Sequence, residues 1–251
     1  MKPEDQAPPR LARQGACWLW HDGQFDEQWL WSSLLNPQGQ PGASRISTGG
    51  RGAAWRLTPS EVIASDLTPS GVNDDPVFVC REYRRGGFMG RVNESRYLWT
   101  GATNTRAHRE FMVMRHAAKL GLPVPKPVAA MACRGKGLGS MFYQAAILTP
   151  WVSHEGNLAS MSHELAWFNA GVTIAKLHAA GIWHADLNVH NILIDADDQA
   201  WLIDFDRARE GVDDPRLLQG NLSRLKRSVD KVCPEMGQRL WPVLCDGYAR
   251  H

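Results

Sequence analysis

The feature that most constrains the fold of this chain is a polar loop followed by two short apolar runs. Residues 184–191 read HADLNVHN, and residues 203–206 read IDFD. The apolar runs at 191–194 and 201–203 flank an Asp-rich turn, which is the pattern of a β-hairpin. Taken singly, the Asp and Asn residues are ordinary for strand ends and turns, so a plain structural hairpin is one interpretation.

Three side chains of this segment together have the chemistry of phosphoryl transfer. The Asp186 carboxylate can accept a proton from an attacking hydroxyl, while the Asn191 amide oxygen and the Asp204 carboxylate are oxygen donors suited to Mg²⁺. An HxDxxxxN pattern with a second Asp after a second short strand has the chain order of the catalytic and metal-binding elements of protein kinases. In a plain hairpin several separate spacings would have to agree by chance, so the pattern favours an enzyme that uses ATP and Mg²⁺. We expect His184 to organise the loop backbone rather than to act as a base.

Composition narrows the class of protein without identifying it. The chain has 251 residues, of which 43% are hydrophobic and 22% charged, as in ordinary globular proteins. A formal net charge of +2 gives no reason to expect a nucleic-acid partner. The five cysteines are scattered and never form a CxxC pair, which argues against a disulfide framework and a zinc site and favours a reducing cytoplasm.

No segment of the sequence has the pattern of a membrane anchor. The charged, Pro-rich start lacks the apolar stretch of a secretory signal. The longest uncharged run, residues 138–153, is short for a membrane span and contains polar residues. We therefore expect any membrane contact to be peripheral.

The order of the expected elements predicts an α+β protein. We expect a flexible N-terminus at residues 1–15, an N-terminal nucleotide-binding lobe at 16–150 and a C-terminal catalytic lobe at 151–251. Turn chemistry and apolar runs predict strands within 53–57, 76–81 and 145–151. Apolar periodicity predicts helices within 105–120 and 162–180 and an amphipathic segment within 218–232. The apolar stripe of the second helix comprises Leu165, Phe168, Val172, Ala175 and Ala179.

Two features of the first lobe are candidates for nucleotide binding. Gly49, Gly50 and Gly52 would let backbone N–H groups approach phosphate closely, although their spacing is not GxGxxG and a plain flexible loop is the alternative. Arg81 stands at the end of a Val-rich strand, where protein kinases carry a phosphate-binding Lys, and Glu110 on the following helix is its natural partner. An Arg can hold phosphate oxygens with two N–H groups but is bulkier than Lys, so a surface Arg remains an alternative.

Longer blocks of the sequence resemble the lipopolysaccharide-core kinase family, in particular its kinases of 3-deoxy-D-manno-octulosonic acid (Kdo). The resemblance covers roughly residues 45–232. It is carried by the blocks REYRRGGFMGR (81–91), GLPVPKP (121–127), YQAAILT (143–149), HADLNVHNIL (184–193), WLIDFD (201–206) and NLSRLKRS (221–228).

The resemblance implies a fold, a reaction and a location. The fold would be two-lobed and protein-kinase-like, with an N-terminal antiparallel sheet plus one helix and a mainly helical, reduced C-terminal lobe. The reaction would move the ATP γ-phosphate onto the 4-hydroxyl of Kdo on Kdo-lipid A, during lipopolysaccharide inner-core synthesis. The enzyme would work as a peripheral protein on the cytoplasmic face of the bacterial inner membrane.

Departures from the protein-kinase pattern count against a protein substrate. Asp206 replaces the glycine of the DFG element, Asn188 stands where protein kinases usually carry Lys, and no APE element follows. An atypical kinase that acts on protein or on another small hydroxyl remains the alternative, and a nucleotide-binding scaffold without turnover is a third possibility.

Two basic segments could contact an anionic acceptor or lipid. Arg84, Arg85 and Arg91 flank two glycines, and we hypothesise that they help to recruit an acceptor that bears carboxylates and phosphates. The amphipathic segment at 218–232 also carries several cations. Its default interpretation is a packing helix with a solvated basic face, and contact with an anionic substrate or lipid is the alternative.

Overall fold

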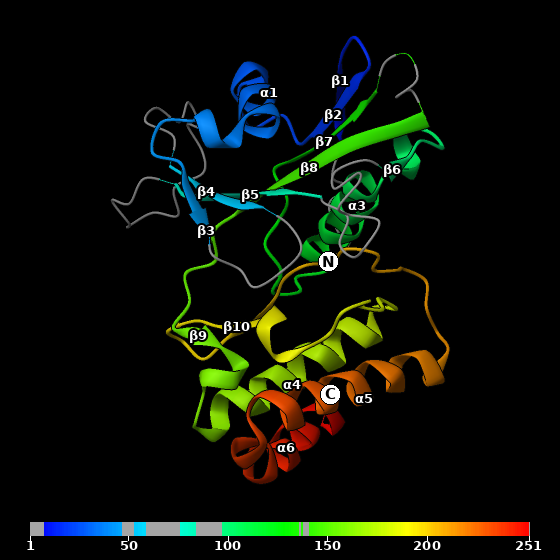
Figure 1. Cartoon of the computed structure of the whole chain (residues 1–251). Helices are drawn as coiled ribbons and strands as arrows, with labels where there is room; N and C mark the ends of the chain where they lie inside the picture. The colour runs from blue at the N-terminus through cyan, green and yellow to red at the C-terminus, as the bar shows by residue number, and fades with distance from the viewer. Residues whose placement is uncertain are drawn as a thin grey trace. The chain divides into compact units, whose positions relative to one another are not determined.

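The protein has an α+β architecture with two compact units. The computed structural model describes residues 8–46, 53–58, 76–83, 97–135, 137 and 141–250 (Figure 1). One unit comprises Met1–Phe111 with Lys126–Trp151, and the other comprises Met112–Pro125 with Val152–His251. The chain thus passes from one unit to the other after Trp151, and residues 112–125 belong to the second unit.

The first unit is built on an antiparallel sheet. Within the described residues its strands run in the order β1-β2-β7-β8-β5-β4-β3, with β6 also paired to β8. Their bounds are β1 (Arg10–Gln14), β2 (Cys17–His21), β3 (Ser44–Ile46), β4 (Ala54–Leu57), β5 (Phe78–Glu82), β6 (Tyr97–Leu98), β7 (Ala129–Arg134) and β8 (Phe142–Pro150). The expectation of a loose chain up to residue 15 is wrong for β1, because its backbone pairs with β2 along its whole length.

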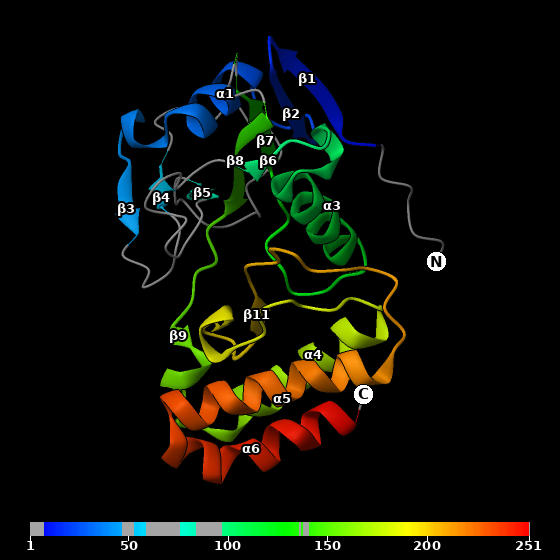
Figure 2. The same ribbon diagram turned by 45° about the vertical axis from the view of Figure 1, so that its right-hand side comes forward.

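Two helices lie against opposite faces of this sheet, α1 (Glu27–Leu35) and the start of α3 (Arg106–Lys119) (Figures 1 and 2). Leu30 of α1 packs in one core with Cys80 of β5. Since side chains alternate along a strand, the next residue, Arg81, points to the other face, where it meets α3. Strand alternation therefore decides which residue of β5 is available to this helix.

The sequence predicts one helix for this lobe, and the structure contains a second one, α1. It has nine residues, fewer than three turns, so apolar periodicity carries little information. Its start is fixed locally, since the Asp26 carboxylate accepts a hydrogen bond from the Trp29 N–H at 2.8 Å. Burial of Leu30, Trp31 and Leu34 against the sheet supplies the remaining stabilisation.

A disulfide joins Cys17 of β2 to Cys133 of β7, which corrects the expectation of no disulfide. The two cysteines are directly opposed in the antiparallel register, with Cα atoms 4.0 Å apart. Their sequence separation of 116 residues hides this proximity from any local pattern. Cysteine usage therefore no longer supports a reducing compartment.

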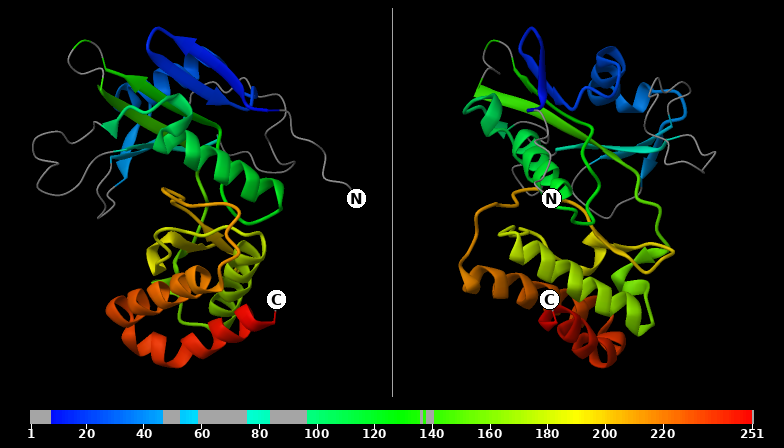
Figure 3. Two further views of the ribbon diagram at one scale, coloured as in Figure 1. Left: turned by 90° about the vertical axis from the view of Figure 1, so that its right-hand side faces the viewer. Right: turned by 180° about the vertical axis from the view of Figure 1, so that it is seen from behind.

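The second unit combines three helices with a small sheet. The helices are α4 (Glu164–Ala179), α5 (Pro215–Val232) and α6 (Pro234–Ala249). The antiparallel strands β9 (Gly156–Asn157), β10 (Ile192–Ile194) and β11 (Ala200–Leu202) lie in the order β11-β10-β9. Strands β10 and β11 form the predicted hairpin, with Ile192 opposite Leu202. Figures 2 and 3 show α6 packed along α4, with α5 beside α6.

Helix α4 is present as predicted, but its predicted apolar stripe is wrong. Leu165 is 53% exposed, whereas Trp167, Ile174 and Leu177 are completely buried. The helix packs against both α6 and β11, so it is buried around most of its circumference. A helix that is apolar on nearly all sides gives no single stripe to read.

Candidate active site

The 184–191 loop is organised by the buried imidazole of His184. Its Nε2–H donates to the Ile203 carbonyl at 3.0 Å, and its Nδ1 accepts from the Asp186 N–H at 3.2 Å. The ring also packs edge-on against Phe205, with centroids 4.9 Å apart. His184 thus ties the loop to the 203–206 segment, which is the organising role expected from the sequence.

Both hydrogen bonds of His184 require a neutral ring. A neutral imidazole offers one donor and one acceptor, whereas its cation offers two donors. Burial lowers the pKa of His184 below its ordinary value, and this outweighs the Ile203 carbonyl and the nearby carboxylates of Asp204 and Asp186, which raise it.

Asp186 has one carboxylate oxygen engaged and one available. Its Oδ1 accepts from Arg224 Nε at 3.0 Å and also from Arg224 Nη2. Among the described residues, no hydrogen bond reaches Oδ2. The side chain is 45% exposed, so an incoming hydroxyl can approach it.

Asn191 is fixed by its amide so that its oxygen remains for a ligand. Its Nδ2 donates to the Asp186 carbonyl at 2.9 Å, and its own carbonyl accepts from the Ile203 N–H at 3.1 Å. The second bond places Asn191 opposite the residue before Asp204. Within the second unit these two bonds hold Asn191 against the Asp186 backbone and beside the segment that carries Asp204.

The donor set suits a magnesium ion that is shared with substrate phosphates. Mg²⁺ prefers oxygen ligands and usually takes only one or two carboxylates from the protein, with water and phosphate oxygens completing the shell. Asp204 and Asn191 supply one carboxylate and one amide oxygen. The part of the chain that the structure describes has no cluster of three His, Cys, Asp or Glu residues arranged to hold a metal ion.

The predicted pair of Arg81 and Glu110 is present in the first unit. Arg81 Nη2 donates to Glu110 Oε1, and the Tyr83 hydroxyl donates to Glu110 Oε2. The Arg81 guanidinium also lies 4.9 Å from the Tyr83 ring centroid. Glu110 is only 2% exposed, so its negative charge is compensated within the protein. Sequence reasoning missed Tyr83, although it stands two residues after Arg81, on the same face of an extended chain.

Some residues singled out in the sequence lie outside the described residues. These are the glycines Gly49, Gly50 and Gly52 and the basic residues Arg84, Arg85 and Arg91. Their proposed contacts with phosphate and with the acceptor remain predictions.

Helix α5 holds the 184–191 loop at three points, a feature that sequence reasoning missed. Asn221 donates to the His184 carbonyl at 2.7 Å and accepts its N–H at 3.1 Å. Arg224 binds Asp186 as described, and Ser228 accepts the Val189 N–H at 3.3 Å. The signal in the sequence was the spacing of these polar residues, which places all three along one side of the helix.

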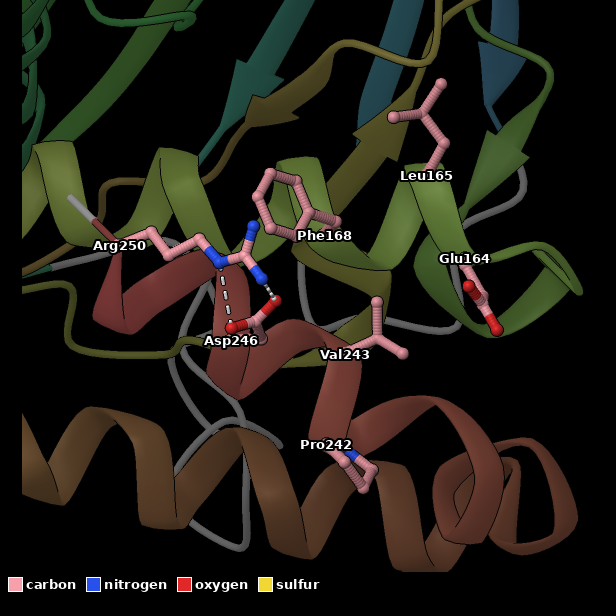
Figure 4. Close-up of a pocket in the computed structure, with 7 residues that line it drawn as sticks. All are labelled: Glu164, Leu165, Phe168, Pro242, Val243, Asp246 and Arg250. Carbon is pink, nitrogen blue, oxygen red and sulfur yellow. Dashed lines mark hydrogen bonds and ion pairs between the residues drawn. The ribbon is translucent and has the colours of Figure 1, made fainter.

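A pocket in the second unit lies elsewhere, lined by residues of helices α4 and α6 (Figure 4). Its lining includes Leu165, Phe168 and the ion pair between Asp246 and Arg250. None of its lining residues belongs to the 184–191 loop or to the 203–206 segment, so this pocket is separate from the site described above.

Comparison with known proteins agrees with this geometry. Residues 64–248 match the model of the "Lipopolysaccharide kinase (Kdo/WaaP) family". A 3-deoxy-D-manno-octulosonic acid kinase of Xanthomonas axonopodis pv. citri is 41% identical over 206 residues, which are 80% of this chain and 76% of that protein. The kinase of the same name from Xylella fastidiosa is 38% identical over 214 residues, 84% of this chain and 75% of that protein. The chain belongs to the lipopolysaccharide kinase (Kdo/WaaP) family.

Proposed function

We propose that this protein transfers the γ-phosphoryl group of ATP to the 4-hydroxyl of Kdo in Kdo-lipid A, during synthesis of the lipopolysaccharide inner core. The relatives named as Kdo kinases, 38–41% identical over about four-fifths of the chain, support the reaction and the sugar. The observation that carries the proposal is the hydrogen-bonded arrangement of Asp186, Asn191 and the Asp204 segment around His184.

Asp186 is the group that orients and deprotonates the acceptor. Its free Oδ2 receives the hydroxyl proton while the hydroxyl oxygen bonds to the γ-phosphorus and the bond to the β–γ bridging oxygen breaks, releasing ADP. Because the transition state is loose, the main contribution of Asp186 is to place the hydroxyl in line with the leaving group. Asn191 and Asp204 would hold Mg²⁺, which neutralises charge on the β- and γ-phosphates.

Arg81 is the proposed phosphate ligand of the first unit. Glu110 and Tyr83 fix the guanidinium in place, and Arg81 is a quarter exposed, so part of its donor fork can reach a phosphate. Gly49, Gly50 and Gly52 would supply backbone N–H groups to the nucleotide. If Arg81 forms only a structural ion pair with Glu110, its replacement should leave the KM for ATP unchanged.

The proposed location is the cytoplasmic face of the inner membrane, as a peripheral protein that contacts anionic lipid. None of the described helices has both the length and the apolar character of a membrane span. The acceptor is a glycolipid, so the enzyme has to reach the membrane surface in some way. Binding to vesicles with and without anionic lipid measures this part of the proposal.

Mass spectrometry of the acceptor tests the reaction. Purified enzyme is incubated with Mg-ATP and Kdo-lipid A, and the product should gain one phosphate, with Asp186→Asn as the inactive control. A second acceptor that lacks the 4-hydroxyl should remain unmodified. Omission of Mg²⁺ should stop the reaction. Phosphate transfer to a generic protein such as casein, with none to the glycolipid, would contradict the proposal and support the alternative protein-kinase activity.

A further inference from the structure

The contact between Arg224 and Asp186 uses only part of each side chain. Arg224 Nε and Nη2 both bind Oδ1 of Asp186, which leaves Oδ2 available. Among the described residues no hydrogen bond is made by Nη1 of this guanidinium, and Nη2 carries a second N–H on the same edge. The Arg224 side chain is 48% exposed, so a ligand can approach its guanidinium beside the Asp186 carboxylate.

The position of Arg224 is set by the helix that carries it. Asn221 lies one turn before it and Ser228 one turn after it, and both bind the backbone of the 184–191 loop. Leu222 and Leu225 are buried on the neighbouring side of α5, so the helix cannot rotate without exposing them. Arg224 is therefore held over the loop at a fixed register.

The ion pair between Arg224 and Asp186 should contribute little to the stability of the fold. Exposed pairs contribute about 0 to 1 kcal/mol, because solvent screens them and two long side chains lose freedom. Arg224 is half exposed and binds one oxygen of Asp186, the proposed catalytic carboxylate. A role in the reaction at Asp186 explains this contact better than a role in stability does. The pair also differs from Lys226–Asp230 on the same helix, which joins neighbouring turns and touches no loop residue.

We propose that Arg224 is a specificity-determining residue that binds the acid group of the acceptor sugar while it holds Asp186. This inference rests on the proposed function, because an octulosonic acid carries a carboxylate and hydroxyls on one sugar. One edge of the guanidinium fixes the base, and the other edge binds the sugar carboxylate with two parallel N–H···O bonds. The two interactions together place the acceptor hydroxyl beside Oδ2 of Asp186. The same sugar without its negative charge loses this alignment.

A cycle of two acceptors and two enzymes tests the assignment. The acceptors are the Kdo glycolipid and its carboxamide, in which the acid is neutral; the enzymes are the wild type and Arg224→Ala. Wild type should prefer the acid by about 30-fold in kcat/KM, and Arg224→Ala should reduce this preference to about twofold. Arg224→Lys, which keeps the charge but loses the planar fork, should show an intermediate preference. With the acid acceptor, Arg224→Ala should have a higher KM for the acceptor than the wild type and an unchanged KM for ATP.

Several outcomes would overturn the inference. If Arg224→Ala lowers activity on both acceptors by the same factor, Arg224 only positions Asp186. If it lowers activity on neither, the contact is an incidental surface pair. Arg216→Ala, which removes an exposed cation from the first turn of α5, should keep the wild-type preference, and a loss there would indicate a general charge effect. Circular dichroism and thermal unfolding confirm that each variant is folded. If the wild type phosphorylates neither acceptor, the proposed function itself fails.

Discussion

At the scale of single residues, Asp204 combines an unusual backbone with a proposed chemical role. Its φ of 61° lies in the left-handed region, where Asn and Asp are tolerated better than other residues with a side chain. Asn is therefore the replacement that removes the charge with the least backbone strain. This allows the catalytic contribution of the carboxylate to be separated from its structural one.

Asp204→Asn should lower kcat by at least about 100-fold, because Mg²⁺ loses its charged protein ligand. The free energy of unfolding without nucleotide should stay within about 1 kcal/mol of the wild type, because the backbone conformation suits Asn. Steady-state assays over a range of Mg²⁺ concentrations and urea unfolding measure the two quantities. Full activity of Asp204→Asn at low Mg²⁺ concentration would show that Asp204 is not a metal ligand.

Glu110 should matter for both stability and nucleotide binding. Glu110→Ala leaves the buried Tyr83 hydroxyl and the Arg81 guanidinium without this acceptor, so we expect unfolding to become easier by about 3 kcal/mol. The KM for ATP should rise as Arg81 loses its orientation. Tyr83→Phe is the matched control, because it removes one hydrogen bond and should cost about 1 kcal/mol with little effect on KM. An unchanged KM in Glu110→Ala would argue against a phosphate-binding role for Arg81.

Local sequence patterns predicted the residues of the loop but not the residues that hold it. Asp186 and Asn191 are five positions apart, and their hydrogen bond lies within one loop, so spacing was sufficient. Asn221 and Arg224 reach this loop from 37 and 38 positions away. Such contacts depend on how α5 packs in three dimensions, which a single sequence does not specify.

At the scale of elements, α4 and α6 meet through two glycines. A Cβ on Gly171 would lie 2.0 Å from the Leu244 carbonyl oxygen, and one on Gly247 would lie 2.2 Å from the Phe168 carbonyl oxygen. Both neighbours are backbone atoms, which cannot rotate away. The absence of side chains at these two positions therefore sets how closely the helices approach.

Gly171→Ala and Gly247→Ala should each destabilise the protein by about 3 kcal/mol, because the helices must separate to admit one methyl group. Gly220→Ala on α5 is the matched control. A Cβ there meets no atom within 4 Å, so Ala should stabilise the helix by roughly 0.5 to 1 kcal/mol. Urea unfolding followed by circular dichroism measures all three variants. A neutral result for Gly171→Ala would show that the helices can move apart freely.

The predictability of an element depended on how many of its sides are buried. Helix α3 has Ala107, Phe111 and Met114 on its buried side, as its periodicity predicted. Helix α4 is covered by α6 and β11, so almost any stripe of it could be read as the core, and the chosen one was wrong. The buried side of a helix can therefore be predicted from sequence when only one side is apolar. When a helix is apolar on nearly all sides, the sequence predicts the helix but not which side is buried.

At the scale of the whole molecule, the sheet order shows what local patterns miss. Strands β2 and β7 pair although more than 100 residues separate Cys17 from Cys133, and their disulfide follows from that pairing. The paired strands β10 and β11 were predicted because a short turn joins them. The general α+β class was accessible from the order of elements, whereas the neighbours of each strand were not.

Buried histidines should make the whole protein acid-labile. Burial is the main cause that lowers the pKa of His178 and His184, whose ordinary value is 6.5. Near pH 6.5 these two histidines bind protons more readily in the unfolded chain than in the folded protein. The free energy of unfolding therefore falls as the pH drops below that value. Between pH 7.5 and 5.5 both buried histidines should therefore contribute to a decline in the free energy of unfolding.

Urea unfolding at several pH values checks this expectation. His178→Gln should flatten the decline, because it removes a group that binds a proton only when the chain unfolds. Constant stability of the wild type between pH 7.5 and 5.5 would mean that His178 and His184 bind protons equally well in both states. That result would contradict the interpretation that His184 is neutral in the folded protein and connects Asp186 to the Asp204 segment through its hydrogen bonds.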